Sequence, residues 1–200
     1  MTVSVSSYAW RVPKLWNDTI EEHRRTVHGA ILEATASLVA QHGLTAVTMS
    51  QIAQATGIGR ATLYKYFPDV EAIMMAWHER QVAGHLHQLA AIGEQGDDPG
   101  QRLRAVLRAY AVIQHDHRGH RLGALLHQGE HMVAARRHLR DFVAGLIADA
   151  AATGQARGDI APGELADFSL HALGAAGGLP DETAVDRLVA LTLAGLLPPG

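Results

Sequence analysis

The chain has 200 residues, 48% of them hydrophobic, and a formal net charge of −3 at pH 7. This allows one large domain, or a small domain joined to a larger one, with a substantial buried core. Because the chain has no cysteine, disulfides, thiolate nucleophiles and cysteine-ligated zinc sites are excluded. No apolar run approaches the ~20 residues of a membrane span, and the N-terminus lacks the layout of a signal peptide. We therefore expect a cytoplasmic protein with no membrane partner.

Charge is distributed unevenly along the chain. Residues 1–68 carry six Lys or Arg and four acidic residues, whereas the remainder carries 11 basic and 16 acidic residues. A mildly basic N-terminal region followed by an acidic remainder favours docking to DNA through one end only.

Residues 1–17 show no helical period, and we expect a flexible N-terminal arm. Arg11 and Lys14 are candidates for a phosphate or minor-groove contact, with a disordered terminus as the alternative. A helix is predicted from Asn17 or Asp18, with acidic residues in its first turn and a stop at residues 42–43. Its apolar stripe consists of Val27, Ile31, Ala34 and Leu38.

Residues 48–67, TMSQIAQATGIGRATLYKYF, predict two short helices joined by a tight turn. Thr48 and Gln51 have the spacing of a capping box at the start of the first helix. Gly57 stands where this helix must stop and where the backbone needs a positive φ. The residues that share one face of the first helix are Met49, Ile52 and Ala53.

The second helix is predicted from about Gly59 to Tyr66. Leu63 and Phe67 are four residues apart and are expected to point inward. Two short helices that cross closely in this way form a helix-turn-helix, whose second helix enters the major groove of DNA.

From about Arg25 to Ile73 the chain resembles the TetR family of bacterial transcriptional repressors. The resemblance covers ILEATASLVAQHG, the stretch 48–67 and PDVEAIM, and its most specific part is TLYKYF followed by proline. It departs from the family at Gly59, where a Ser or Thr is usual, and at His28, near a position often occupied by Arg or Lys.

The resemblance implies an all-α, TetR-like fold with two domains. An N-terminal three-helix helix-turn-helix domain would bind DNA at residues 18–68, and a C-terminal helical domain at 69–200 would bind a ligand and dimerise. The spacing of the apolar residues agrees with an all-α fold, since no strand pattern is found and about nine helices are predicted. The six predicted after residue 68 are 69–92, 103–115, 122–128, 130–152, 162–174 and 181–196.

Three side chains of the second short helix are candidates for reading DNA bases. Arg60 is the best of them, because its planar guanidinium can bond O6 and N7 of guanine together. Thr62 and Lys65 are candidates for other base edges or for a thymine methyl group.

Three more side chains are candidates for phosphate contacts. Tyr64 and Tyr66 can donate hydroxyl hydrogen bonds, and Thr48 offers its hydroxyl and N–H groups at a helix N-terminus. One such domain makes few contacts, so useful affinity for a double-stranded operator needs a homodimer on a palindromic site.

The last two predicted helices are poor in charge and rich in Gly, Ala and Leu, so a partner subunit is the expected cover. The resemblance implies that they pair across a twofold axis, and the alternative is burial within one subunit. The candidate interface residues are Phe168, Leu173, Val185, Leu188, Val189 and Leu196.

The helices between residues 70 and 152 are expected to hold an unknown small-molecule effector in an apolar cavity. The candidate lining residues, for which plain core is the alternative, are Met74, Trp77, Leu86, Leu107, Tyr110, Leu125 and Phe142. A ligand that favours the DNA-incompetent state would release the operator, with a typical coupling of ~1–3 kcal/mol. The predicted protein is a sequence-specific, homodimeric repressor.

The chain has 13 histidines, and residues 127–131 read HQGEH, a zinc-peptidase pattern. Gly129 lies inside the motif and no third ligand is indicated, so we predict no metal site, no cofactor and no catalytic residue. A metal-responsive regulator on the same fold and a helical metallohydrolase are the alternatives. No nucleophile–base pair, phosphate loop or dinucleotide fingerprint supports an enzyme.

Overall fold

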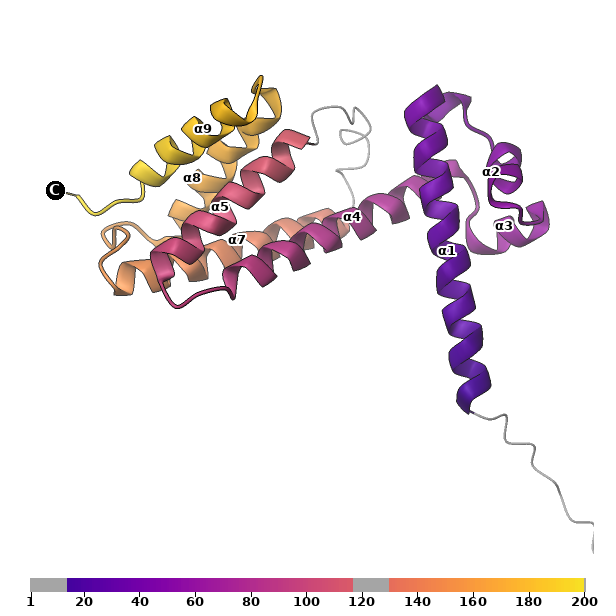
Figure 1. The fold of residues 1–200 in the computed structure, drawn as a ribbon, viewed down its shortest axis with the longest axis horizontal. Coiled ribbons are helices and arrows are strands. Elements are labelled where there is room, and N and C mark those ends of the chain that lie inside the picture. The colour runs from indigo at the N-terminus through magenta and orange to yellow at the C-terminus, as the bar shows by residue number, and fades with distance from the viewer. Residues whose placement is uncertain (1–13, 117–129, 200) are drawn as a thin grey trace, which may run out of the picture. The chain divides into compact units, whose positions relative to one another are not determined.

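The computed structural model describes residues 14–116 and 130–199, without the side chains of residues 14–20, 130 and 131. These residues form eight α-helices and two 3-10 helices and no strand, which confirms the all-α prediction (Figure 1). The elements are α1 (Lys14–His42), η1 (Leu44–Ala46), α2 (Met49–Thr56), α3 (Arg60–Tyr66), α4 (Val70–Gly93), α5 (Pro99–Asp116), α7 (Glu130–Ala152), α8 (Pro162–Gly174), η3 (Ala175–Gly178) and α9 (Glu182–Ala194). The predicted helix at 122–128 lies outside the described residues. Among the described helices, none has the length and apolar character that a membrane span requires.

The chain forms two compact units, Met1–Trp77 and His78–Gly200. The division falls within α4, whereas the domain boundary expected from the sequence lies between residues 68 and 69, just before that helix.

In the N-terminal unit, α1 packs on α2 and α2 packs on α3. The core residues of this unit are Ile31, Leu32, Val39, Val47, Met49, Ile52, Ala53, Leu63, Phe67, Ile73 and Met74, each less than a tenth exposed. They come from the four α-helices of the unit and from the residues that join them, and none lies in η1, so α3 is held by the same core as α1. Thr35 is buried among them, and its hydroxyl donates to the Ile31 carbonyl at 2.8 Å.

The start of α1 differs from the prediction. The helix begins at Lys14 rather than at Asn17 or Asp18, so it has no acidic residue in its first turn. Asn and Asp favour a cap, but inside a helix they cost at most ~0.7 kcal/mol relative to alanine, so they do not force a start. Residues 14–17 of the predicted arm are therefore helical, and residues 1–13 lie outside the described part of the chain.

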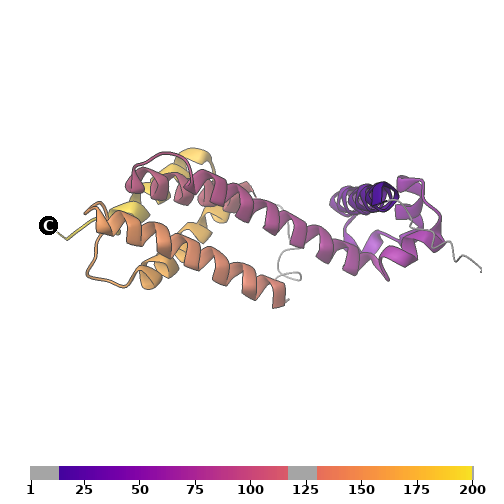
Figure 2. The ribbon, with the colours of Figure 1, turned by 90° about the horizontal axis from the view of Figure 1, so that it is seen from below.

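In the C-terminal unit, α5 contacts α7, α8 and α9, and α8 contacts both α7 and α9 (Figures 1 and 2). Leu107 of α5, Ile147 of α7 and Leu173 of α8 are fully buried in one cluster, which Leu89 of α4 joins. Fully burying a side chain of this size stabilises a fold by about 1.5–3 kcal/mol, so this cluster fixes the helices around α5.

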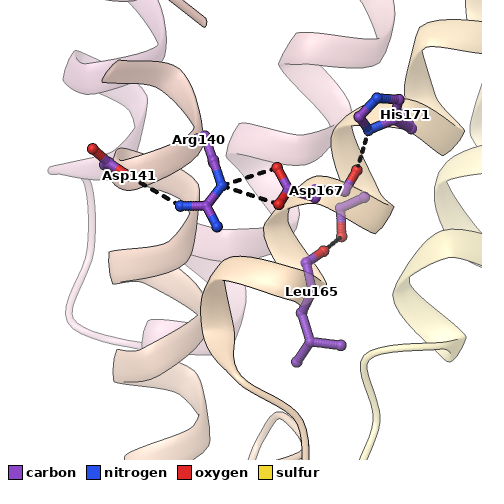
Figure 3. Close-up of polar contacts among 6 residues, drawn as sticks. Arg140, Asp141, Leu165, Asp167 and His171 are labelled. Atoms are coloured by element: carbon purple, nitrogen blue, oxygen red, sulfur yellow. Dashed lines mark hydrogen bonds and ion pairs between the residues drawn. The ribbon is translucent and has the colours of Figure 1, made fainter. Parts of the chain in front are cut away.

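Polar contacts set the helix ends and join two of the helices. Asp69 and Asp181 cap α4 and α9, accepting from backbone N–H groups three residues on at 2.8 Å in each case. Between α7 and α8, Arg140 Nε lies 3.0 Å from both carboxylate oxygens of Asp167 (Figure 3). The hydrogen bond to Asp167 also raises the pKa of Arg140, which is charged in any case.

Candidate nucleic-acid interface

The helix α2 begins with the predicted capping box. The Gln51 N–H donates to Thr48 Oγ1 at 3.4 Å, and the Thr48 N–H donates to Gln51 Oε1 at 2.8 Å. The Thr48 hydroxyl also donates to Gln51 Oε1 at 2.8 Å. Both donors of Thr48 are thus engaged within the cap, so a phosphate contact from its hydroxyl competes with Gln51.

The turn between α2 and α3 has the predicted geometry. Gly57 ends α2 in the left-handed region, at φ 70° and ψ 12°, and its N–H donates to the Gln54 carbonyl. Gly59 follows as the N-cap of α3 without a side-chain hydrogen bond, and its carbonyl accepts from Thr62 and Leu63 at 2.9 and 3.0 Å. The turn therefore fixes α3 through the backbone alone.

The buried side of α3 is narrow, and its other side is exposed. Leu63 is fully buried and Phe67, the C-cap, is 6% exposed, whereas Tyr66 is half-buried. The exposed candidates for DNA contact are Arg60, Thr62, Tyr64 and Lys65. Within the described residues, these four side chains make no hydrogen bond or ion pair, so their donors are available to a partner.

The charge of this surface has one sign. Residues 48–67 contain Arg60 and Lys65 and no acidic residue. Two unpaired cations and two tyrosine hydroxyls on one short helix suit a polyanion with hydrogen-bond acceptors.

A side chain that the sequence analysis did not assign to DNA binding is Ser50, which is exposed in the first turn of α2. The first N–H groups of a helix lack intrahelical acceptors, so a hydroxyl there stands beside backbone donors. The position of Ser50, one residue after the start of a capped helix, is the sequence signal from which it could have been named as a candidate for a phosphate contact.

The predicted ligand-pocket residues are not all brought together. Met74 is buried in the core of the N-terminal unit, to which Trp77 also belongs, whereas Leu86 belongs to the C-terminal unit. Leu125 lies outside the described residues.

Within the C-terminal unit, the other predicted lining residues pack as core. Leu107 is fully buried, and Tyr110 and Phe142 pack against the same cluster. Burial raises the pKa of the Tyr110 hydroxyl. A Cβ on Gly93 would lie 2.7 Å from Phe142 Cζ, so the ring occupies the space that this glycine leaves.

A pocket of about 350 Å³ lies between α4 and α5, at residues that the sequence analysis did not select. Its lining residues are His85, Gln88, Arg108, Ala109, Val112, Ile113 and Asp116. Arg108 Nε lies 2.9 Å from Asp186 Oδ1 of α9, so its charge already has a partner. Most of the lining is polar, which explains why a search for apolar stripes missed it.

The six predicted interface residues occupy different environments. Leu173, Val185, Val189 and Leu196 are buried in the core of their own unit, and Leu188 packs against it. Phe168 is 50% exposed. Two apolar residues that were not predicted to lie in the interface are more exposed, Leu191 at 72% and Leu197 at 56%. The large apolar side chains exposed on α8, α9 and the described residues that follow are therefore Phe168, Leu191 and Leu197.

The HQGEH motif falls largely outside the described residues, since His127 is among those not described and the side chain of His131 is not described either. Among the residues that the structure describes, no group of three or more His, Asp or Glu is arranged to hold a metal ion.

Residues 31–76, which include α2 and α3, match the model of the family described as bacterial regulatory proteins, tetR family. Three curated relatives are similar to the chain over less than half of its length. An uncharacterised HTH-type transcriptional regulator of Mycobacterium bovis is 30% identical over 88 residues, which is 44% of this chain and 47% of that protein.

The other two relatives are from Mycolicibacterium smegmatis. The transcriptional activator FasR is 30% identical over 95 residues, covering 47% of this chain and 43% of FasR. The transcriptional repressor LfrR is 32% identical over 94 residues, covering 46% of each protein. The chain thus spans about half the length of the curated relatives it matches.

Solved structures share the fold over most of the chain. A TetR/AcrR-family regulator of Thermobifida fusca superposes with a TM-score of 0.71 and 21% identity, covering 84% of this chain and 97% of that one. AibR in complex with isovaleryl coenzyme A and operator DNA gives a TM-score of 0.61 at 20% identity, covering 87% and 100%. At these identities the likeness shows the fold alone.

Proposed function

Through residues 31–76 the chain belongs to the TetR family of bacterial regulatory proteins, and on that premise we propose that it is a homodimeric, sequence-specific repressor. In this proposal it acts in the cytoplasm on a palindromic operator and is released by a small-molecule ligand. Its matched relatives are transcriptional regulators rather than enzymes.

The observation that carries the proposal is the exposed side of α3. Arg60 and Lys65 have no partner among the described residues, and Tyr64 is 49% exposed beside them. Side chains of this kind on the second helix of a helix-turn-helix are placed for the major groove and its phosphates. We propose Arg60, Thr62 and Lys65 as base readers.

Phosphate contacts are proposed for Tyr64 and Tyr66. Thr48 is proposed as a third contact that must share its hydroxyl with Gln51, and its larger role is to hold the N-terminus of α2. Removing a bidentate base contact costs about 1–3 kcal/mol and relaxes specificity at one base pair.

The proposed homodimer is supported by the exposed apolar residues on α8 and α9. Phe168 and Leu191 expose large side chains, and an apolar surface of this kind favours a partner. A twofold dimer doubles the number of DNA contacts and places two α3 helices on inverted half-sites.

The proposed effector site is the pocket between α4 and α5. Its volume lies at the small end of the range for ligand pockets, ~300–1,000 Å³. The presence of isovaleryl coenzyme A in the AibR complex supports acyl thioesters as first probes. Ala109→Trp narrows the pocket, and we expect it to abolish release of DNA by any probe that acts there.

The function is tested by selecting duplexes from a randomised pool with the full-length chain. We expect an enriched sequence with two inverted half-sites, bound with an affinity that falls steeply with salt. Arg60→Ala should weaken binding and relax one base position in each half-site. A pool without enrichment would count against sequence-specific DNA binding.

Arg104→Ala is the matched control, because Arg104 is an exposed arginine of α5 in the C-terminal unit. We expect the control to bind the selected duplex like the wild type. Equal losses for both variants would mean that Arg60 acts only through net charge.

A further inference from the structure

An aromatic contact in the N-terminal unit joins α1 to the end of α3. The His28 ring lies with its centroid 5.0 Å from that of Phe67, at an interplanar angle of 41°. The same ring lies 6.5 Å from Tyr66, at 56°. His28 is half-buried, and at the sequence level it was notable only because it stands where a basic residue is common.

The two partners of His28 differ in burial. Phe67 is 6% exposed, and its N–H donates to the Leu63 carbonyl at 3.0 Å, so its ring is fixed by the core. Tyr66 is the last residue of α3 and is half-buried, whereas Tyr64 is 49% exposed. His28 therefore rests on a fixed ring and limits the directions open to the Tyr66 ring.

We propose that His28 is a positioning residue of the DNA interface. Packed on Phe67, its imidazole sets the direction of the Tyr66 side chain, whose hydroxyl donates to a DNA phosphate. The inference rests on the proposed function, because it assigns His28 a role in the same surface. It differs from a direct role for His28, in which the imidazole itself would contact the phosphate.

The two roles predict different salt dependences. A cation that neutralises a phosphate releases counterions, so losing it lowers the slope of log K against log salt by about one. A neutral tyrosine hydroxyl releases none, and a ring that orients this hydroxyl releases none either. Aromatic packing, in contrast, is retained by a phenylalanine but not by a lysine.

The test measures fluorescence anisotropy of the selected duplex with full-length variants at several salt concentrations. We expect Tyr66→Phe to weaken binding about three- to tenfold for each subunit of the proposed dimer, because each subunit loses one hydrogen bond. His28→Ala should weaken it similarly with an unchanged salt slope, and His28→Phe should bind within about twofold of the wild type. His28→Ala combined with Tyr66→Phe should bind no worse than Tyr66→Phe alone.

His23→Ala is the matched control, since His23 is an exposed histidine of the same helix, and it should bind like the wild type. Thermal unfolding of each variant identifies temperatures at which all of them are folded, and the titrations are made at those temperatures. If His28→Ala does not fold, His28→Phe and His28→Lys still decide between the roles.

Three results would overturn the inference. In the first, His28→Phe binds as weakly as His28→Ala. In the second, His28→Ala costs the same factor with and without the Tyr66 hydroxyl. In the third, His28→Lys binds more tightly than the wild type with a slope steeper by about two, one for each subunit of the proposed dimer. A wild type that prefers no sequence would instead refute the proposed function, and the inference with it.

Discussion

Thr48 and Gln51 cap each other at the start of α2. Each backbone N–H donates to the side chain of the other residue, at 3.4 Å to Thr48 Oγ1 and at 2.8 Å to Gln51 Oε1. The pair satisfies two N–H groups that would otherwise lack an acceptor at the helix end. The start of α2 is thus held by a contact between residues three apart in the sequence.

Replacing Thr48 by alanine should destabilise the N-terminal unit by about 1 kcal/mol, the usual cost of losing an N-cap side chain. Urea unfolding followed by circular dichroism of the full chain measures this change. Ser50→Ala, in the same turn but outside the cap, should stay within about 0.5 kcal/mol of the wild type. Equal effects of the two substitutions would contradict a special role for the cap.

Gly57→Ala should also destabilise the unit, by about 1–2 kcal/mol, because the backbone there has φ 70° and alanine is strained in that region. A Cβ at this position would meet no atom within 4 Å, so the cost comes from the backbone alone. Gly84→Ala is the control, since Gly84 lies within α4 in equally open space. That substitution should stabilise the helix by up to about 1 kcal/mol. Destabilisation by both would point to a general cost of adding a methyl group.

The part of the interface that the sequence predicted well is the part set by local rules. The capping box and the positive φ of Gly57 each depend on residues within one turn of each other. The start of α1 was mistaken because Asn17 and Asp18 resemble a cap, and a cap residue is tolerated inside a helix.

The residues whose surroundings the sequence could not predict are those whose environment depends on distant segments. Met74 and Leu86 are candidate lining residues of one predicted cavity but belong to different compact units. Leu173 and Phe168 lie on one apolar helix, yet one is fully buried and the other is half exposed. Periodicity shows that a residue is apolar and on which side of a helix it lies, but only the packing of other helices decides what covers it.

Asp98 links the start of α5 to the loop after α7, and this link should depend on pH. Its Oδ1 accepts from the Gln101 N–H at 2.7 Å, and its Oδ2 accepts from Gln155 Nε2 at 3.0 Å. These hydrogen bonds, that from the Gln101 backbone foremost, hold the pKa of Asp98 below its ordinary value of 3.8. A lowered folded-state pKa stabilises the protein above pH 3.8, and this contribution is lost as the pH falls through the folded-state value.

Asp98→Asn keeps a good cap residue but removes the charge, so it isolates this contribution. We expect the variant to be less stable than the wild type at pH 5–7 and the difference to vanish at pH values below the folded-state pKa. Urea midpoints at four pH values between 2 and 6 measure it. Asp97→Asn, at the adjacent carboxylate, should show no such convergence, and a constant difference for Asp98→Asn would refute the linkage.

The exposed apolar residues of α8 and α9 indicate which substitutions should dissociate the proposed dimer. Leu191 is 72% exposed, and Phe168 lies beside Gly195 at the end of α9, where a Cβ would be 3.2 Å from its ring. Leu191→Glu places two buried charges near the twofold axis of the proposed interface, and burying an unpaired charge costs several kcal/mol. We expect sedimentation velocity to give a dimer for the wild type and a monomer for Leu191→Glu and for Phe168→Glu.

Val133→Glu, at an apolar residue of α7 that is 65% exposed, makes the same chemical change elsewhere and should remain dimeric. Because one α3 alone makes few DNA contacts, the monomeric variants should also lose affinity for the two-half-site duplex far more than for a half-site. A wild type that sediments as a monomer, or a control that dissociates as readily, would rule out this surface as the dimer interface.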